Sequence, residues 1–292
     1  MADGQSRRSA LIALGLLTLI WSYNWIVMKQ ALRYIGPFDF SAIRYALGTA
    51  VLFALLLRRD SLRPPPWLPL VAVIGLAQTT GFQALVQWAL VSGGAGQTAL
   101  LAYTMPFWVL LLGWGLLSEK VSQLQAVGLI VAAVGLLLIL EPWLGFGGAF
   151  STALALAGGF CWALGTVLSK WLFQRKQVSV LSLTAWQMLF GCLGLIVLAG
   201  LVPEQPIEWS GYLIGAVIYN GLLSSGLAWL LWLMAVQRLP AHVAGLSSLA
   251  IPVLSVAFAW ALLGERPSAA VVGGIVCICA ALLVINWRPK RP

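Results

Sequence analysis

The chain has 292 residues, of which 61% are apolar and only 9% are charged. A soluble domain averages roughly 45–50% apolar and about 25% charged residues, so this composition excludes an ordinary soluble protein and indicates a membrane protein. The net charge is +9, but the basic residues stand in short clusters between apolar runs. Because no continuous basic stripe is present, we expect no nucleic-acid partner.

Ten apolar runs are long enough to cross a bilayer, for which a helix needs about 20 mostly apolar residues. In chain order the predicted membrane helices occupy residues 10–30, 38–57, 67–90, 96–117, 122–140, 150–173, 179–200, 210–234, 241–263 and 268–287. All four cysteines lie inside these runs, where they form neither a disulfide framework nor a zinc site. The sequence therefore predicts an all-α integral membrane protein with no metal and no cofactor.

The distribution of basic residues predicts the orientation of the chain in the membrane. An even number of spans puts both termini on one side, and all but four of the 17 basic residues then belong to that side. The exceptions are Lys29, Arg33, Arg44 and Arg266. Because cytoplasmic loops are enriched in Lys and Arg, we expect a multi-pass protein of the cell inner membrane with both termini in the cytoplasm.

An internal repeat relates the two halves of the chain, since residues 95–139 pair without a gap with residues 241–285. The matched residues include Pro106 with Pro252, Trp114 with Trp260, and Glu119 with Glu265. We divide the chain into a cytoplasmic tail (1–9), a first five-helix repeat (10–140), a linker (141–149), a second five-helix repeat (150–287) and a basic cytoplasmic tail (288–292). Because five is odd, the second repeat enters the membrane from the opposite face. Inverted repeats of this kind support alternating access to a central cavity at the midplane.

This pattern resembles the EamA-type transporters of the drug/metabolite transporter superfamily. The resemblance rests on Pro106 with Glu119 and Lys120, on Pro252 with Glu265 and Arg266, and on Arg44 in the second helix. It covers essentially the whole chain and is greatest for bacterial aromatic amino-acid exporters of the YddG type. The resemblance implies export of aromatic and other neutral amino acids, such as methionine or threonine. Lys29 has a counterpart in Lys170, whereas Arg44 has none in the second half.

Candidate substrate-binding residues are polar and aromatic side chains predicted at mid-membrane depth. They are Trp21, Asn24, Gln78, Gln83, Tyr103, Trp108, Trp162, Tyr219, Asn220, Ser224 and Ser248. Each also has a structural interpretation, as a packed core tryptophan or as an interhelical hydrogen-bonding group. The tryptophans expected deep in the membrane are Trp108, Trp114, Trp186, Trp229, Trp232 and Trp260. An aromatic, nearly uncharged cavity suits a zwitterion with an apolar side chain.

The two matched prolines, Pro106 and Pro252, are predicted hinges. A proline inside a helix removes one amide donor and kinks the helix, which would free the carbonyls of Ala102 and Ser248. Those carbonyls either bind a substrate ammonium or only shape the bent helices, and we favour the hinge.

The charged residues constrain gating and coupling. All eight acidic residues lie at predicted helix ends or in loops, so no carboxylate near the midplane is available to carry a proton or bind sodium. We therefore expect facilitated or weakly coupled transport. Glu119, Glu265 and Arg44 are assigned to gating or latching. Arg44 either attracts a substrate carboxylate or, as we favour, has a structural role through backbone carbonyls or the headgroup region.

The sequence thus predicts a transporter of small zwitterionic solutes rather than an enzyme. An exporter of drug-like amines or other metabolites is the alternative within the same class. A membrane-embedded lipid-modifying enzyme is the alternative from another class, but the chain has no HExxH or GxSxG motif and a single histidine. The expected partners are a small-molecule substrate and the lipid bilayer. The oligomeric state is left open, and a monomer suffices.

Overall fold

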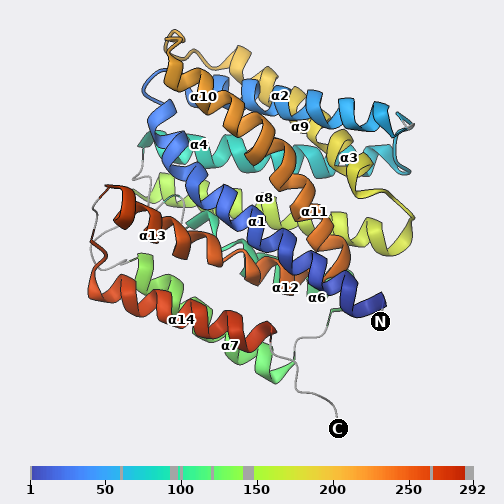
Figure 1. Cartoon of the computed structure of the whole chain (residues 1–292), viewed down its shortest axis with the longest axis vertical. Helices are drawn as coiled ribbons and strands as arrows, with labels where there is room; N and C mark the ends of the chain where they lie inside the picture. The colour runs from blue at the N-terminus through green and yellow to red at the C-terminus, as the bar shows by residue number, and fades with distance from the viewer. Residues whose placement is uncertain are drawn as a thin grey trace.

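The structure, a computed structural model, describes residues 2–59, 62–92, 98, 101–119, 122–140, 148–263 and 266–286. These residues form a bundle of helices with α1, α8 and α11 near its middle and α7 beside α14 at one edge (Figure 1). No strand occurs in the described part of the chain, so the predicted all-α fold class is confirmed at this level.

The helices follow the predicted runs closely. The first half forms α1 (Ala2–Ala31), α2 (Pro37–Arg58), α3 (Leu68–Gly75), the π-helix η1 (Leu76–Gly81), α4 (Phe82–Ser92), α6 (Met105–Leu117) and α7 (Gln123–Leu140). The second half forms α8 (Ala149–Arg175), α9 (Val180–Leu201), α10 (Gly211–Tyr219), the π-helix η3 (Asn220–Leu227), α11 (Ala228–Arg238), α12 (Ala241–Ser247), α13 (Ala250–Leu263) and α14 (Ala269–Asn286).

Seven helical stretches among the described residues are long and apolar enough to span a membrane. They are Arg8–Ala31, Pro37–Arg58, Leu68–Ala89, Ala149–Arg175, Val180–Leu201, Gly211–Arg238 and Ala241–Phe258. Three further apolar helices are shorter: Met105–Leu117, Ala126–Ile139 and Ala269–Val284. The chain is therefore a multi-pass membrane protein by composition, whereas the count of ten crossings stays a prediction.

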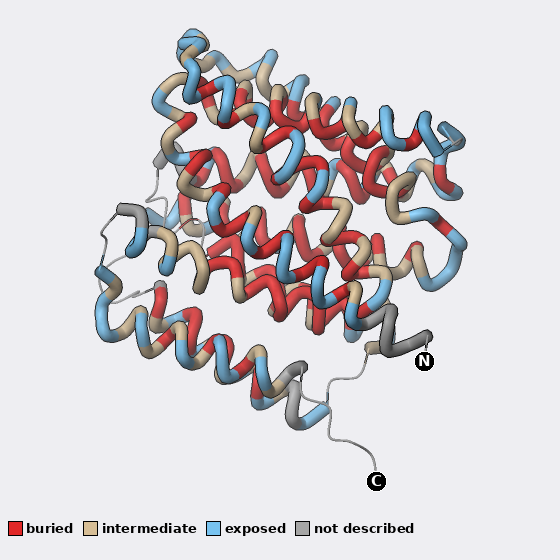
Figure 2. The backbone as a smooth tube through the Cα atoms, viewed as in Figure 1, coloured by how far each residue is buried: buried red, intermediate tan, exposed pale blue. Residues whose placement is uncertain are grey.

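The two halves of the sequence interdigitate. α2 packs on α9 and η3, α4 and α6 pack on α8, α1 packs on α11 and α13, and α7 packs on α14. Every one of these pairs joins a helix of the first half to a helix of the second. Buried residues accordingly concentrate in the middle of the bundle, in one main apolar cluster that draws on both halves (Figure 2).

Two π-helical segments interrupt the third helical stretch of each half. η1 lies between α3 and α4, and η3 lies between α10 and α11, where the sequence predicts continuous α-helices. π-helical turns shift the backbone register and commonly occur at functional sites. The polar side chains of η1 pack on α8 and α9: Gln78 donates to Thr166 (3.1 Å), and Thr79 donates to Gln187 (3.3 Å).

The fourth helix of each half is broken just before its proline. Tyr103 and Thr104 form a turn ahead of α6, and Ser248 and Leu249 form one between α12 and α13. The Ser248 carbonyl accepts a hydrogen bond from the N–H of Ile251 (3.0 Å). The expectation that Pro252 frees the Ser248 carbonyl is therefore wrong, because the turn gives this oxygen a local donor.

The prolines themselves stand in the first turn of the helices that follow these breaks. Pro106 lies at the start of α6, where a missing N–H is tolerated because the first amides of a helix have no intrahelical partner. The Ala102 carbonyl faces Gly159 of α8, where an added Cβ would lie 2.9 Å from the oxygen. The hinge role of Pro106 and Pro252 stays a prediction.

We expect Gly75→Ala to destabilise the fold, because an added Cβ would collide with the backbone of Gln187 on α9. Neither element can yield by a side-chain rotation, so overpacking should lower the free energy of unfolding by about 1–3 kcal/mol. Thermal unfolding of the purified protein in detergent would measure the effect.

The matched control for this substitution is Gly215→Ala in α10, where an added Cβ meets no atom within 4 Å. We expect the control to be neutral or slightly stabilising, since alanine is the better helix former. Equal thermal midpoints for the two variants would contradict the close approach of α3 and α9.

Candidate functional site

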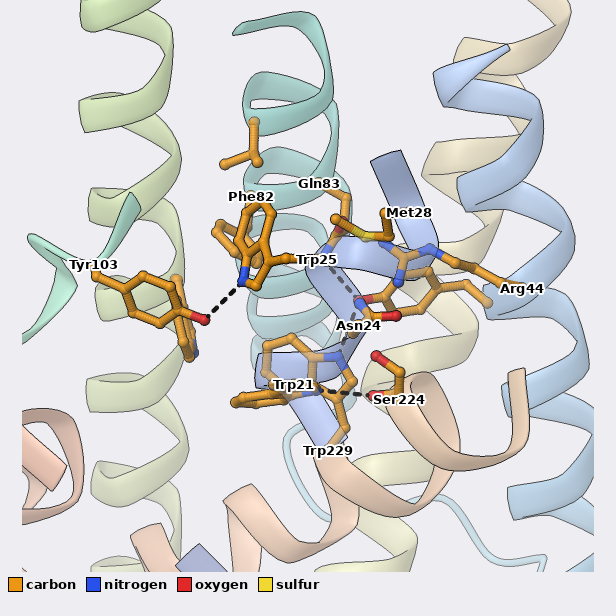
Figure 3. A pocket seen from close by; sticks show the side chains of 13 residues that line it. Trp21, Asn24, Trp25, Met28, Arg44, Phe82, Gln83, Tyr103, Ser224 and Trp229 are labelled. Carbon is orange, nitrogen blue, oxygen red and sulfur yellow. Dashed lines mark hydrogen bonds between the residues drawn. The ribbon is translucent and has the colours of Figure 1, made fainter. Parts of the chain in front are cut away.

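A cavity opens inside the bundle between helices of both halves (Figure 3). Four of its lining residues, Trp21, Asn24, Trp25 and Met28, follow one face of α1 at helical spacing. The other lining residues are Arg44 and Tyr45 of α2, Phe82, Gln83 and Val86 of α4, Tyr103, Trp162 of α8, Ser224 of η3 and Trp229 of α11. The space between these side chains that no atom fills is about 450 Å³, including the part open to the outside. The centre of a water molecule fits into only about 40 Å³ of the cavity.

Tryptophans from both halves form the base of this cavity. The ring of Trp21 lies 5.6 Å from Trp162, 5.2 Å from Trp229 and 6.1 Å from Trp232. Trp162 also lies 5.5 Å from Trp232, and most of these contacts are edge-on or tilted. Aromatic rings prefer such arrangements, which contribute about 0.5–1.5 kcal/mol per pair beyond area burial. Trp21, Trp162 and Trp229 therefore close one side of the cavity with apolar surface, and Trp232 packs against the first two.

Three tryptophans that line the cavity use their N–H groups in specific hydrogen bonds. Trp21 donates to the carbonyl of Ser224 (3.1 Å), and Trp25 donates to the hydroxyl of Tyr103 (3.2 Å). Trp229 donates to the hydroxyl of Tyr45 (2.9 Å). These bonds join elements that are far apart in sequence, and they fix the orientation of the rings that line the cavity.

Arg44 is the only basic residue among the described residues that line the cavity, and it is 2% exposed. Its guanidinium donates to the side-chain oxygens of Gln83 (2.6 Å) and Asn220 (3.2 Å). It also lies 4.8 Å from the centre of the Tyr45 ring. Among the described residues one ion pair is found, between Glu119 and His242. Arg44 therefore has no carboxylate partner in that part of the chain. The guanidinium bonds to side-chain amides where backbone carbonyls were expected, so that interpretation is wrong, and the choice between a structural and a substrate-binding role of Arg44 stays a prediction.

Three buried polar atoms of the lining residues have no hydrogen-bond partner: Asn24 Oδ1, Arg44 Nε and Trp162 Nε1. Buried polar groups are nearly always paired, so each unpaired group requires an explanation. Two of these atoms are donors and one is an acceptor. Residues of the cavity wall therefore hold unused hydrogen-bonding groups of both kinds.

The structure brings seven of the predicted residues together at the cavity: Trp21, Asn24, Gln83, Tyr103, Trp162, Ser224 and Arg44. The other five lie elsewhere. Gln78 bonds to Thr166, Trp108 packs against Phe160, Tyr219 donates to the Ile20 carbonyl, Asn220 holds Arg44, and Ser248 bonds to the Gly245 carbonyl. Whether any of the twelve binds substrate stays a prediction.

Sequence reasoning missed several cavity residues. They are Trp25, Met28, Tyr45, Phe82 and Val86. Spacing from Trp21 along α1 would have found the first two, since positions four and seven residues further along a helix share its face. Trp114 and Trp260 are 74% and 58% exposed, so they face the surroundings of the bundle rather than the cavity, while their predicted depth in the membrane stays a prediction.

At one end of the bundle, Glu119 holds the start of α12. Its carboxylate accepts the N–H of Ala241 (2.9 Å) and lies 2.7 Å from Nδ1 of His242. Burial alone would raise the pKa of Glu119, but the hydrogen bonds from His242 and Ala241 outweigh it and hold the pKa below its usual value. A carboxylate at a helix N-terminus also interacts favourably with the helix dipole.

A second carboxylate holds the start of α2 at the opposite end. Glu204, which follows α9, accepts the backbone N–H groups of Phe38 (3.0 Å) and Asp39 (2.8 Å). Gly36 is required beside it, because a Cβ there would collide with the Glu204 side chain. Both carboxylates join the two halves of the chain. The predicted latch at Glu265 lies outside the described residues.

The chain was compared with known proteins. The sequence profile of the EamA-like transporter family matches it twice, over residues 8–141 and again over residues 149–287. The chain therefore belongs to the EamA-like transporter family, and the family that the sequence resembled is confirmed. It carries two EamA repeats within a multi-pass membrane protein.

Individual relatives cover almost the whole chain at low identity. It is 27% identical over 288 residues to the uncharacterised transporter YoaV of Bacillus subtilis (strain 168), covering 96% of this chain and 98% of the relative. It is 26% identical over 306 residues to a probable amino-acid metabolite efflux pump of Salmonella typhimurium (strain LT2), covering 98% of each. A solved crystal structure with 24% identity and a TM-score of 0.81 covers 96% of this chain and 98% of its own, which supports the fold.

We expect Glu119→Gln to lower the thermal midpoint of the purified protein, because a carboxylate accepts stronger, charge-assisted hydrogen bonds than an amide. The pKa of Glu119 is lower in the folded state than in the unfolded chain. The ionised carboxylate therefore stabilises the fold at any pH above the unfolded pKa, and this stabilisation is lost as the pH falls through the folded pKa. The difference between wild type and variant should be about 1 kcal/mol near neutral pH. It should shrink as the pH falls below the ordinary pKa of a glutamate and through the lowered pKa of Glu119 in the folded state. Thermal unfolding in detergent across this pH range tests it, and a difference independent of pH would contradict the role of Glu119.

Proposed function

We propose that this chain exports neutral amino acids, above all aromatic and large apolar ones, across the cell inner membrane. Methionine and threonine are further candidate substrates. The observation that carries the proposal is the cavity, in which the buried charge of Arg44 lacks a carboxylate partner and faces walls of aromatic rings. Such a site suits a solute with a carboxylate and an apolar side chain, since ligand sites are mostly apolar with a few fixed polar groups.

In this proposal the chain crosses the membrane ten times, as two inverted repeats of five helices. One set of contacts supports the inversion. The connection after α9 meets the connection after α1, where Glu208 N–H donates to the Tyr34 carbonyl (2.8 Å) and Gln205 bonds to the Leu32 carbonyl (3.1 Å). Since α1 and α9 end on the same side, α8 runs opposite to α1, although both open their halves. The excess of Lys and Arg assigns the other side, with both termini, to the cytoplasm.

Alternating access is supported by the small size of the cavity. The space for water centres is about 40 Å³, which holds about three water molecules. An aromatic amino acid therefore enters only when the surrounding rings move. Glu119 and Glu204 join the two halves of the chain at opposite ends of the bundle. In this proposal these two contacts restrain the movement of one half relative to the other.

The competing functions fit this cavity less well. Drug-like amines suit the aromatic walls, but the positive charge of Arg44 repels a cation at close range. A lipid-modifying enzyme needs a nucleophile with a base or a bound metal ion. Among the described lining residues Ser224 carries a hydroxyl, but the lining offers neither a histidine nor a carboxylate to act as its base. The name of the Salmonella typhimurium relative, a probable amino-acid metabolite efflux pump, supports amino-acid export.

Substitution of Trp162 tests whether the aromatic base of the cavity recognises substrate. In liposomes with the purified protein, we expect Trp162→Phe to reduce uptake of radiolabelled phenylalanine about 2- to 10-fold, because one aromatic contact is weakened. Trp114→Phe is the control, since Trp114 is 74% exposed and remote from the cavity. Equal uptake by wild type and both variants, at equal folded yield, would contradict the proposed site.

The proposed coupling is tested with a pH gradient. The lining residues that the structure describes include no carboxylate and no histidine, so we expect a pH difference alone not to concentrate phenylalanine in the liposomes. Internal phenylalanine should reach, but not exceed, the external concentration. Accumulation that depends on the pH gradient and is abolished by a protonophore would contradict facilitated transport.

A further inference from the structure

Arg44 is held in one orientation by two neutral amides. Asn220 uses its Nδ2 on the Ala216 carbonyl (3.0 Å), which leaves Oδ1 to accept from Arg44. Gln83 uses its Nε2 on the Tyr45 hydroxyl (2.9 Å), which leaves Oε1 for the second guanidinium nitrogen. These bonds position the guanidinium but do not neutralise it. An uncompensated buried charge is strongly unfavourable, so the site favours an anion.

Nη1 and Nη2 of Arg44 each make one of these hydrogen bonds, whereas the third guanidinium nitrogen, Nε, is buried and has no partner. Among the described lining residues, the buried acceptor without a partner is Oδ1 of Asn24, on α1. Figure 3 shows Arg44 and Asn24 on the same side of the cavity, while Tyr103 lies on the other side and Trp21 and Trp229 lie at its base. One side of the cavity is therefore polar, and the remaining walls are aromatic.

We propose that Arg44 and Asn24 form a head-group site that requires a free carboxylate and a free ammonium on the same substrate. The carboxylate accepts from Arg44, and the ammonium donates to the amide oxygen of Asn24. The substrate side chain then points toward the tryptophan rings. Gln83 and Asn220 are positioning residues. The inference rests on the proposed function and narrows it to free α-amino acids, excluding amines and organic acids of the same shape.

Three ligands with the same aromatic group separate the two contacts in an equilibrium binding assay on the purified full chain. They are phenylalanine, phenylalaninamide, which lacks the carboxylate, and 3-phenylpropionate, which lacks the ammonium. We expect wild type to bind phenylalanine at least about tenfold more tightly than either analogue, since a hydrogen bond to a charged group commonly accounts for this factor or more.

The variants should remove one preference each. With Arg44→Gln, phenylalanine and phenylalaninamide should bind within about threefold of each other. With Asn24→Leu, phenylalanine and 3-phenylpropionate should bind within about threefold of each other. This variant should still bind phenylalanine more tightly than phenylalaninamide. Lys29→Gln is the control for loss of a positive charge, because Lys29 is exposed on the same helix as Asn24. It should keep both preferences.

If Arg44→Gln does not fold, Arg44→Lys keeps the charge but loses Nε and the planar guanidinium. Its affinity for phenylalanine should fall about tenfold. Unchanged affinity in that variant, or an unchanged preference for phenylalanine over its amide in folded Arg44→Gln, overturns the inference. A third outcome also overturns it: chloride alone stabilises the protein against unfolding, the effect requires Arg44, and phenylalanine does not compete with chloride. Arg44 would then bind an inorganic anion.

Failure of this inference is distinct from failure of the proposed function. Transport of phenylalanine in liposomes with selectivity independent of Arg44 and Asn24 overturns the head-group site and leaves amino-acid export standing. Wild type that neither binds nor transports any of the three ligands, nor other neutral amino acids, overturns both.

Discussion

Inside a bilayer, backbone N–H and C=O groups have no water to bind, so the chain has to satisfy them itself. Helices do this along most of the chain, and the places where they are interrupted lie within the bundle. The breaks before Pro106 and Pro252 are closed by local turns, and the Thr104 and Ser248 hydroxyls bond to carbonyls three residues earlier (2.7 Å each). The π-helix η3 contributes the Ser224 carbonyl that accepts from Trp21. The irregular backbone therefore lies where protein covers it and where the cavity forms.

The cavity exists because the two halves of the chain interdigitate. Arg44 of the first half bonds to Asn220 of the second, and Trp21 packs on Trp162 and Trp229. Each half supplies an incomplete wall, so neither half encloses the site alone. A conformational change that moves one half relative to the other would therefore change the cavity directly. This arrangement links the packing of the bundle to the proposed transport function.

The ends of the bundle are fastened by carboxylates at helix N-termini. Glu119 holds α12 and Glu204 holds α2, and in each case one half provides the carboxylate and the other half the helix. Lys170 adds hydrogen bonds to the Gln237 and Leu239 carbonyls (3.2 and 2.7 Å) next to α12. Polar contacts between the two halves are therefore present at both ends of the bundle.

The sequence by itself determined the helical membrane class, the repeat and the family, because apolar length, Lys and Arg counts and matched Pro, Trp and Glu positions are properties of the chain alone. It also identified Trp21, Trp162, Asn24 and Arg44 as candidates from their depth. Only the tertiary structure decided which helix faces meet. In a membrane, the lipid-facing and the buried sides of a helix are both apolar, so hydropathy did not distinguish exposed Trp114 from buried Trp229. The partners of Arg44, the π-helices and the cavity residues beside it depend on contacts between distant segments, which local sequence patterns do not encode.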